Sequence, residues 1–241
     1  LAETRLALET AEHARAEADR LTAELTSLHA DVQSRRRFSG HGSAMAQAYN
    51  HIILPLANKR DQQTQIKWGI ADFEHRFGRK PEGMWLAETA VDTDSLEALV
   101  DNGVKFTVLA PRQCKAVRFE EDDQWHEVNG GVDSRRAYRC PLPSGRSIDL
   151  FFYDGEVSKA VAFEGLLNDG RLLADRLMNS LDANDDVQIA QIATDGESYG
   201  HHHKKGEMAL AFCLNHIEEN EHFTLTNYGQ FLELHPPVWE A

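Results

Sequence analysis

Carboxylate and imidazole side chains gather in one short stretch of the sequence, IATDGESYGHHH at residues 192–203. Asp195 and Glu197 follow an apolar run, and three consecutive histidines come after them. Two carboxylates that face one cleft can divide the roles of proton donor and ionised partner, whereas a carboxylate with imidazoles can bind a metal ion. The DGE letters recur at 154–156 after another apolar run, so two copies compete for one reactive role.

This chemistry depends on a scaffold that brings such side chains together. From about residue 44, helical and extended patterns alternate, which predicts an α/β fold with a parallel sheet. Ligands of such folds bind at the carboxyl ends of strands, and three predicted strands lead into a carboxylate: Glu88, Asp154 and Asp195. We predict strands at 84–87, 105–109, 147–153 and 187–193, and helices at 44–54, 61–77, 158–167, 171–181, 207–218 and 228–234, with a further helix that Asp94 caps and Gly103 closes.

Residues 1–37 differ from the rest of the chain because they contain neither Gly nor Pro. Ala, Leu and Val recur there at alternating spacings of four and three, which is a heptad seam, at positions 7, 11, 14, 18, 21, 25, 28 and 32. The pattern predicts one long helix, which either packs on its own domain or pairs with a second copy in a coiled-coil homodimer. Residues 38–241 then form the second domain.

The composition limits the partners of the chain. Its 241 residues carry a formal net charge of −14, which disfavours nucleic acid and anionic membranes as partners and is compatible with a neutral, hydroxyl-rich ligand. The three cysteines show no CxxC spacing, as is typical of reduced thiols in a cytoplasmic protein. No apolar run reaches the length of a membrane span, and the first residues lack the pattern of a signal peptide. We therefore expect a cytoplasmic protein.

The histidines leave a metal site and a hydrogen-bonding role open. On an extended backbone His201 and His203 share one side, and His202 faces the other. Their spacing matches no zinc motif, so we predict that His201 hydrogen-bonds a polar ligand and that the other two are loop residues. His41 and His51 lie upstream and could join a metal site only through the fold.

Three segments follow one another in an informative order: YNHIILPL at 49–56, GMWLAETA at 83–90 and TDGESYGH at 194–201. They resemble glycoside hydrolase family 57, whose motifs are a His followed by an ILPL-type run, a WL(A/P)E segment and a D(A/G)ExFGH segment. The likeness runs from about Gly40 to about Glu240. It is greatest with a bacterial branch of the family that carries SGHGSAMAQAYNH and IATDGE(T/S)YGHHH.

The resemblance implies a retaining enzyme that hydrolyses α-glucans or related α-glycosides, or transfers their glycosyl units, with no obligatory metal or other cofactor. It implies Glu88 as the nucleophile, Asp195 as the acid/base and an incomplete (β/α)7 TIM-like barrel over 38–241. The DGE copy at Asp195 has the family's flanking residues, and the other copy does not. Trp85, three residues before Glu88, either stacks on a sugar ring or belongs to the core. We expect substrate contacts from five side chains: His51, Trp85, Asp154, Glu197 and His201, of which Asp154 is either part of the site wall or a structural residue.

The chain departs from the family in one way that matters for the fold. The opening strand of the family ends in His-Gln-Pro, and this tripeptide occurs nowhere in the sequence. We therefore expect a barrel that is incomplete at its N-terminal side, with an exposed sheet edge beside an open cleft.

Two other functions stay open. A metal-dependent carbohydrate hydrolase, such as a deacetylase, would use Asp195 with His201 and either His41 or His51 to activate water. A sugar-binding remnant would keep the cleft and carry out no turnover.

Overall fold

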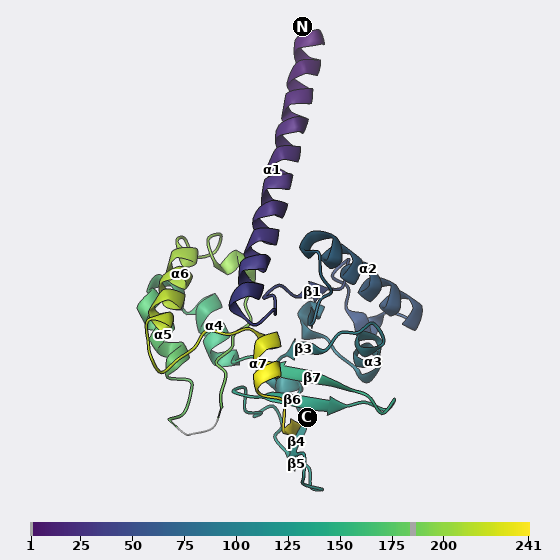
Figure 1. Cartoon of the computed structure of the whole chain (residues 1–241), viewed down its shortest axis with the longest axis vertical. Helices are drawn as coiled ribbons and strands as arrows, with labels where there is room; N and C mark the ends of the chain where they lie inside the picture. The colour runs from purple at the N-terminus through teal and green to yellow at the C-terminus, as the bar shows by residue number, and fades with distance from the viewer. Residues whose placement is uncertain (1, 184–186) are drawn as a thin grey trace.

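A mixed α/β body carries one long N-terminal helix in the computed structural model, which describes residues 2–183 and 187–241 (Figure 1). The α/β class expected from the sequence is confirmed. The helices are α1 (Ala2–Arg37), α2 (Lys59–Phe77), α3 (Thr93–Asp101), α4 (Gly155–Phe163), α5 (Gly170–Met178), α6 (Gly206–Glu218) and α7 (Tyr228–Leu234). The strands are β1 (Ala46–Gln47), β2 (Met84–Trp85), β3 (Phe106–Leu109), β4 (Ala116–Phe119), β5 (His126–Glu127), β6 (Ala137–Pro141), β7 (Ser147–Phe152) and β8 (Trp239–Glu240). Short 3-10 turns are η1 (Leu54–Leu56), η2 (Ala87–Thr89), η3 (Pro111–Gln113), η4 (Leu166–Asn168) and η5 (Gly196–Ser198).

The strands form two adjoining sheets. β1 pairs in parallel with β2, and the larger sheet has the order β3-β7-β6-β8-β4-β5. A parallel bridge between Gly83 and Phe106 links the start of β2 to β3, and β3 pairs in parallel with β7. The strands β1, β2, β3 and β7 therefore point in one direction, so their carboxyl ends lie along the same edge.

The sheets differ in part from the barrel that the resemblance implies. β6 runs antiparallel to β7, and the extended segment 187–193 is not a strand. The Ile189 N–H donates to the carbonyl of Arg135, and the Gln191 carbonyl accepts a bond from the Asp154 N–H. The predicted strand at 187–193 is wrong. These two hydrogen bonds go to two separate parts of the chain, so the segment does not form a continuous hydrogen-bond ladder with one neighbouring strand. The incomplete (β/α)7 barrel stays a prediction.

The segment 44–54 contains β1 and a loop, so the helix predicted there is also wrong. Helix α2 supplies the partners of its backbone. The Tyr49 N–H donates to the backbone carbonyl of Gln65, and the Asn50 N–H donates to the Gln65 side chain at 2.8 Å. Gly69 of α2 lies so close to β1 that a Cβ there would overlap the Gln47 carbonyl. The apolar residues of 44–54 thus pack a strand and a loop against α2.

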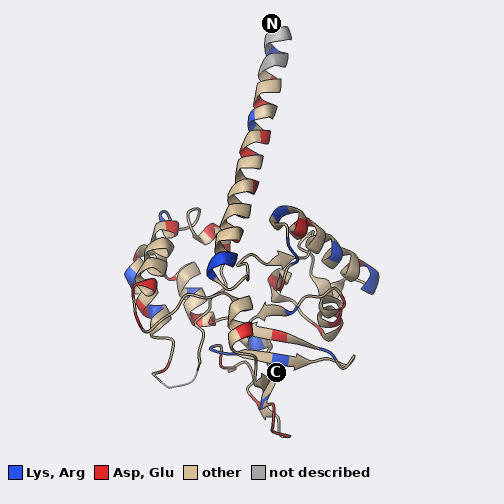
Figure 2. Cartoon of the chain, viewed as in Figure 1, with Lys and Arg blue, Asp and Glu red and all other residues tan. Residues whose placement is uncertain are grey.

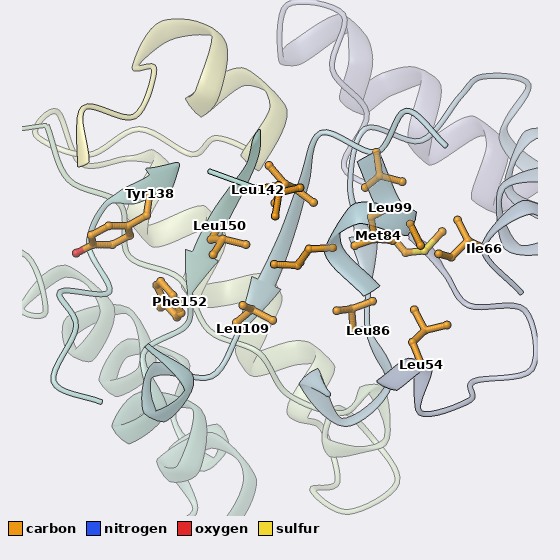
Figure 3. Packing of buried hydrophobic residues seen from close by; sticks show 14 of the residues in the cluster. Leu54, Ile66, Met84, Leu86, Leu99, Leu109, Tyr138, Leu142, Leu150 and Phe152 are labelled. Atoms are coloured by element: carbon orange, nitrogen blue, oxygen red, sulfur yellow. The ribbon is translucent and has the colours of Figure 1, made fainter. Parts of the chain in front are cut away.

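The main core lies between the parallel strands and helices α2 and α3 (Figure 3). Met84 and Leu86 contribute from β2 and its end, Ile66 from α2 and Leu99 from α3, and all four side chains are fully buried. Burying one such side chain contributes about 1.5–3 kcal/mol. The residues just before Glu88 are therefore held in place by the packing of the main core.

Helix α1 contacts the body near its C-terminal end. Leu8, Leu21 and Leu25 are 60%, 46% and 67% exposed, and charges of both signs occur along the helix (Figure 2). Asp31 is buried and accepts two hydrogen bonds from Arg79, of 2.7 and 2.9 Å. The predicted long helix is confirmed. Among the described residues, no helix has the length and apolar character needed to cross a membrane.

His41 joins the loop after α1 to two other parts of the fold. Its Nδ1 lies 2.8 Å from Glu82, just before β2, and its Nε2 lies 2.9 Å from Glu233 of α7. Burial opposes the imidazolium charge, but the hydrogen bonds and charges of the two glutamates outweigh burial and raise the pKa of His41. Burial likewise opposes ionisation of Glu82, but its bonds with His41 and Lys105 lower the pKa of that carboxyl.

These shifts predict a stability that falls as the pH rises above about 6.5. A histidine with a raised folded-state pKa contributes stability that is fully present below its unfolded pKa, about 6.5, and is lost as the pH rises through the folded pKa. The melting temperature should decline through that range, and His41→Gln should flatten the decline. Thermal melts between about pH 6 and about pH 9 measure this, with the exposed His222→Gln as the control. Equal slopes in wild type and His41→Gln would contradict the assignment.

Candidate active site

A cleft of about 1110 Å³ opens at the carboxyl ends of the parallel strands, and Glu88 and Asp195 both line it. Both residues are exposed. Among the described residues, neither carboxylate is engaged in an ion pair or accepts a hydrogen bond. Glycoside hydrolysis uses two carboxyl groups that flank the scissile bond, so these two residues are candidates for such a pair. Other lining residues come from strands β2 and β3, from helices α4 and α7, from η3, and from the segments beside β1, β7 and η5: Met45, Trp85, Val108, Arg112, Tyr153, Glu156, Ser158, Lys159, Phe163, Thr194, Tyr199 and Tyr228.

Glu88 lies on a strained turn directly after β2. Its φ is 56°, and Thr89 follows with φ 53°, so two residues with side chains occupy the left-handed region in succession. Such conformations persist when the surroundings hold them, and they cluster at functional sites. Here Leu86, Ala87 and Thr89 are buried while Glu88 is exposed. Gln113 holds the turn, because its side chain donates to the Thr89 carbonyl at 2.6 Å and accepts from the Ala110 N–H at 2.8 Å.

Asp195 begins the short turn η5, and its carbonyl accepts the Ser198 N–H. The hydroxyl groups of Thr194 and Tyr199 lie 2.8 Å apart, so the residue before Asp195 is bonded to the residue after η5. The Ala193 N–H donates to the Ser158 hydroxyl in α4 at 3.1 Å. Asp195 therefore lies in a loop that is held together by an internal hydrogen bond and is hydrogen-bonded to α4.

Aromatic rings form much of the wall around the two carboxylates. Trp85 borders the cleft and also a second hollow of about 590 Å³ between β1 and α2, so it belongs partly to the core and partly to the site. Tyr228 contacts the Phe151 ring at a centroid distance of 4.5 Å, and burial raises the pKa of its hydroxyl. Phe163, at the end of α4, is 83% exposed although it lines the cleft. An exposed ring such as that of Phe163 suits the apolar face of a sugar.

Four of the predicted substrate-contacting residues do not line the cleft: His51, Asp154, Glu197 and His201. Asp154 caps α4, since one of its oxygens accepts the N–H groups of Glu156 and Val157 at 3.0 and 2.9 Å. His51, Glu197 and His201 are exposed. The His201 ring rests edge-on against His202, with centroids 4.9 Å apart. Substrate contact by these four residues stays a prediction.

The imidazoles do not converge on Asp195. His41 uses both ring nitrogens on Glu82 and Glu233, and His51 and His201 lie outside the cleft lining. Within residues 2–183 and 187–241, no group of three or more His, Cys, Asp or Glu side chains is arranged to hold a metal ion. The residue set proposed for metal-activated water is therefore not assembled.

Several side chains of the site were not foreseen from the sequence: Gln113, Lys159, Phe163, Tyr199, His203 and Tyr228. Tyr199 and His203 stand inside the IATDGESYGHHH stretch, so their nearness to Asp195 was a usable signal. His203 was expected to be a loop residue. It is half-buried, and its Nε2 lies 3.0 Å from the Ala162 carbonyl of α4.

The sequence matches the profile of glycosyl hydrolase family 57 over residues 19–239, and the chain belongs to that family. Over 71 residues it is 30% identical to Alpha-amylase 1 of Dictyoglomus thermophilum, a match that covers 30% of this chain and 10% of the amylase. The chain thus corresponds to a small part of that relative.

Solved structures share the fold at low identity. The 4-alpha-glucanotransferase of Thermococcus litoralis matches with a TM-score of 0.64 and 18% identity, covering 82% of this chain and 29% of the other. A putative polysaccharide deacetylase of Mycobacterium smegmatis matches with a TM-score of 0.58 and 15% identity, covering 84% of this chain and 65% of the other. The fold is therefore shared by enzymes with different named activities. The likeness of fold does not assign this chain to a family, whereas the match to the family profile does.

Proposed function

We propose that this chain is the catalytic part of a retaining glycoside hydrolase or transglycosylase that acts on α-glucans. Glu88 is the nucleophile that attacks the anomeric carbon, and Asp195 protonates the leaving oxygen and then deprotonates the acceptor. One observation carries the proposal. In a chain that belongs to glycosyl hydrolase family 57, these two carboxylates line the same cleft and have no ion-pair or hydrogen-bond partner within residues 2–183 and 187–241.

The walls of the cleft support a neutral sugar chain as the ligand. Trp85, Tyr153, Phe163 and Tyr228 offer ring faces, while Glu156 and Lys159 on α4 offer polar groups for hydroxyls. The names of the relatives, an alpha-amylase and a 4-alpha-glucanotransferase, agree with a glucan. Transfer to a second sugar competes with hydrolysis to the extent that the bound acceptor excludes water.

A panel of α-linked oligosaccharides tests this function. We expect products whose new anomeric centre first appears in the α configuration, as seen by proton NMR within the first turnovers. Products longer than the substrate would show transfer, and shorter products with a matching rise in reducing ends would show hydrolysis. A first product in the β configuration would contradict the double displacement.

The metal-dependent alternative makes an opposite prediction about chelation. Water activation by a bound ion would be lost together with the ion. The two-carboxylate mechanism uses no ion, so turnover by chain dialysed against a chelator should equal that of untreated chain. Loss of turnover that added metal restores would favour the deacetylase-like function.

We also propose that residues 1–37 form a separate helical unit that pairs two copies. The support is the heptad seam together with the exposed Leu21 and Leu25. Sedimentation should give a dimer for the full chain and a monomer for a chain that starts at Leu28, which keeps Asp31. The same association state for the two chains would remove the proposal.

A further inference from the structure

Residues 193–203 form a loop that contains Asp195, and both ends of this Asp195 loop are hydrogen-bonded to α4. At its start, the Ala193 N–H donates to the Ser158 hydroxyl at 3.1 Å. At its finish, His203 Nε2 lies 3.0 Å from the carbonyl of Ala162. Ser158 and Ala162 are four residues apart on one helix, so the two attachments lie about one turn apart along it.

The second attachment fixes the role of the His203 ring. A carbonyl oxygen only accepts hydrogen bonds, so Nε2 must carry the proton that it donates. Ala162 is among the last four residues of α4 (Gly155–Phe163), whose carbonyls have no partner within the helix. His203 therefore satisfies an acceptor that the helix itself leaves open.

Contacts inside the loop carry this attachment back to Asp195. Tyr199 and His203 form a parallel bridge, and the Tyr199 hydroxyl bonds that of Thr194 at 2.8 Å. Gly206 packs against the loop so closely that a Cβ there would approach the Ser198 carbonyl to 3.1 Å. A shift of His203 would thus move Tyr199 and, through it, Thr194 and its neighbour Asp195.

We propose that His203 is a positioning residue that holds Asp195 at its place in the cleft, and this rests on the proposed function of Asp195. The same helix presents Lys159 and Phe163 to the cleft, so the attachment also fixes Asp195 relative to that wall. Misplacing a catalytic group by about 1 Å can cost on the order of 100-fold in rate. The third histidine of the HHH run acts through Asp195 and does not touch the substrate.

The test compares three variants of the full chain. His203→Ala removes the donor, His203→Gln keeps an N–H on a side chain of similar reach, and His202→Ala is the matched control on an exposed neighbour. We expect kcat to fall about 10- to 100-fold in His203→Ala, with KM changed less than about 3-fold. Gln at position 203 should restore most of kcat, and His202→Ala should match wild type.

Hydrogen exchange of the peptide 194–203 gives a readout that does not need turnover. Exchange should be faster in His203→Ala than in wild type, and close to wild type in His203→Gln. Unchanged exchange in His203→Ala would overturn the proposal. Equal losses of kcat in the Ala and Gln variants would also overturn it, because the imidazole itself would then be needed. Full turnover by Asp195→Asn would instead refute the proposed function, and the exchange data would still report on the attachment.

Discussion

Replacing Glu88 by Gln should abolish turnover of α-glucans while leaving the fold intact. The side chain is exposed in the cleft and makes no hydrogen bond or ion pair within the described part of the chain, so its amide analogue disturbs no contact. An amide cannot form the covalent glycosyl ester, and loss of a nucleophile costs on the order of 10³-fold or more in kcat. Unchanged circular dichroism and melting temperature would confirm that the loss is chemical.

Asp195→Asn should behave differently, and the difference identifies the roles. Loss of a general acid costs about 10²- to 10⁴-fold, but a substrate with an acidic leaving group needs no protonation. The variant should therefore form the glycosyl-enzyme from such a substrate and then stall for want of a base. Azide should restore turnover and give a glycosyl azide of retained configuration, whereas Glu88→Ala with azide should give the inverted product. If the Asp195 variant gave the inverted azide and the Glu88 variant the retained one, Asp195 would be the nucleophile and Glu88 the acid/base.

The elements predicted well from the sequence are those whose signals are local. Helix α7 begins and ends at the predicted residues, and α2 ends before Gly78, whose φ of 63° explains why glycine closes the helix. Strands β3 and β7 lie within the predicted apolar runs. In each case the pattern that predicts the element lies within the element or at the residue next to it.

The errors have a non-local cause. The helix predicted at 44–54 was replaced by β1 and a loop because Gln65, on α2, takes up the backbone N–H groups of Tyr49 and Asn50. The small strand β8 exists because Trp239 pairs with Phe119, which lies far earlier in the chain. No pattern within either segment encodes these partners.

The site divides in the same way. The rule that ligands bind at strand ends gave Glu88, Asp154 and Asp195, and the family resemblance selected Glu88 and Asp195, which line one cleft in the structure although no strand precedes Asp195. The strained turn at Glu88 and the attachment of His203 to Ala162, 41 residues away, depend on the folded chain. Residue types near a motif can thus be named from sequence, but the bonds that position them cannot.

The ion pair between Asp31 and Arg79 should be the most sensitive point for stability outside the core. Their side chains are 1% and 11% exposed, and Arg79 also donates to the Ala44 carbonyl and lies over the Phe73 ring. Gly42 has no room for a Cβ, because that atom would overlap the pair. The pair, together with the hydrogen bond from Arg79 to the Ala44 carbonyl, therefore joins the C-terminal part of α1 to the loop that leads into β1.

Asp31→Ala should destabilise the protein by about 3–5 kcal/mol, because it leaves the Arg79 charge buried without its partner. Replacing both members, as in Asp31→Ala with Arg79→Met, should recover much of the loss, since no unpaired charge remains. Glu24→Ala, which breaks an exposed pair with Arg20 on the same helix, should change the melting temperature little. Trypsin distinguishes local from global effects: cleavage after Arg35, Arg36 or Arg37 should quicken in Asp31→Ala before other sites do. An Asp31→Ala protein as stable as wild type would show that α1 is held by other contacts.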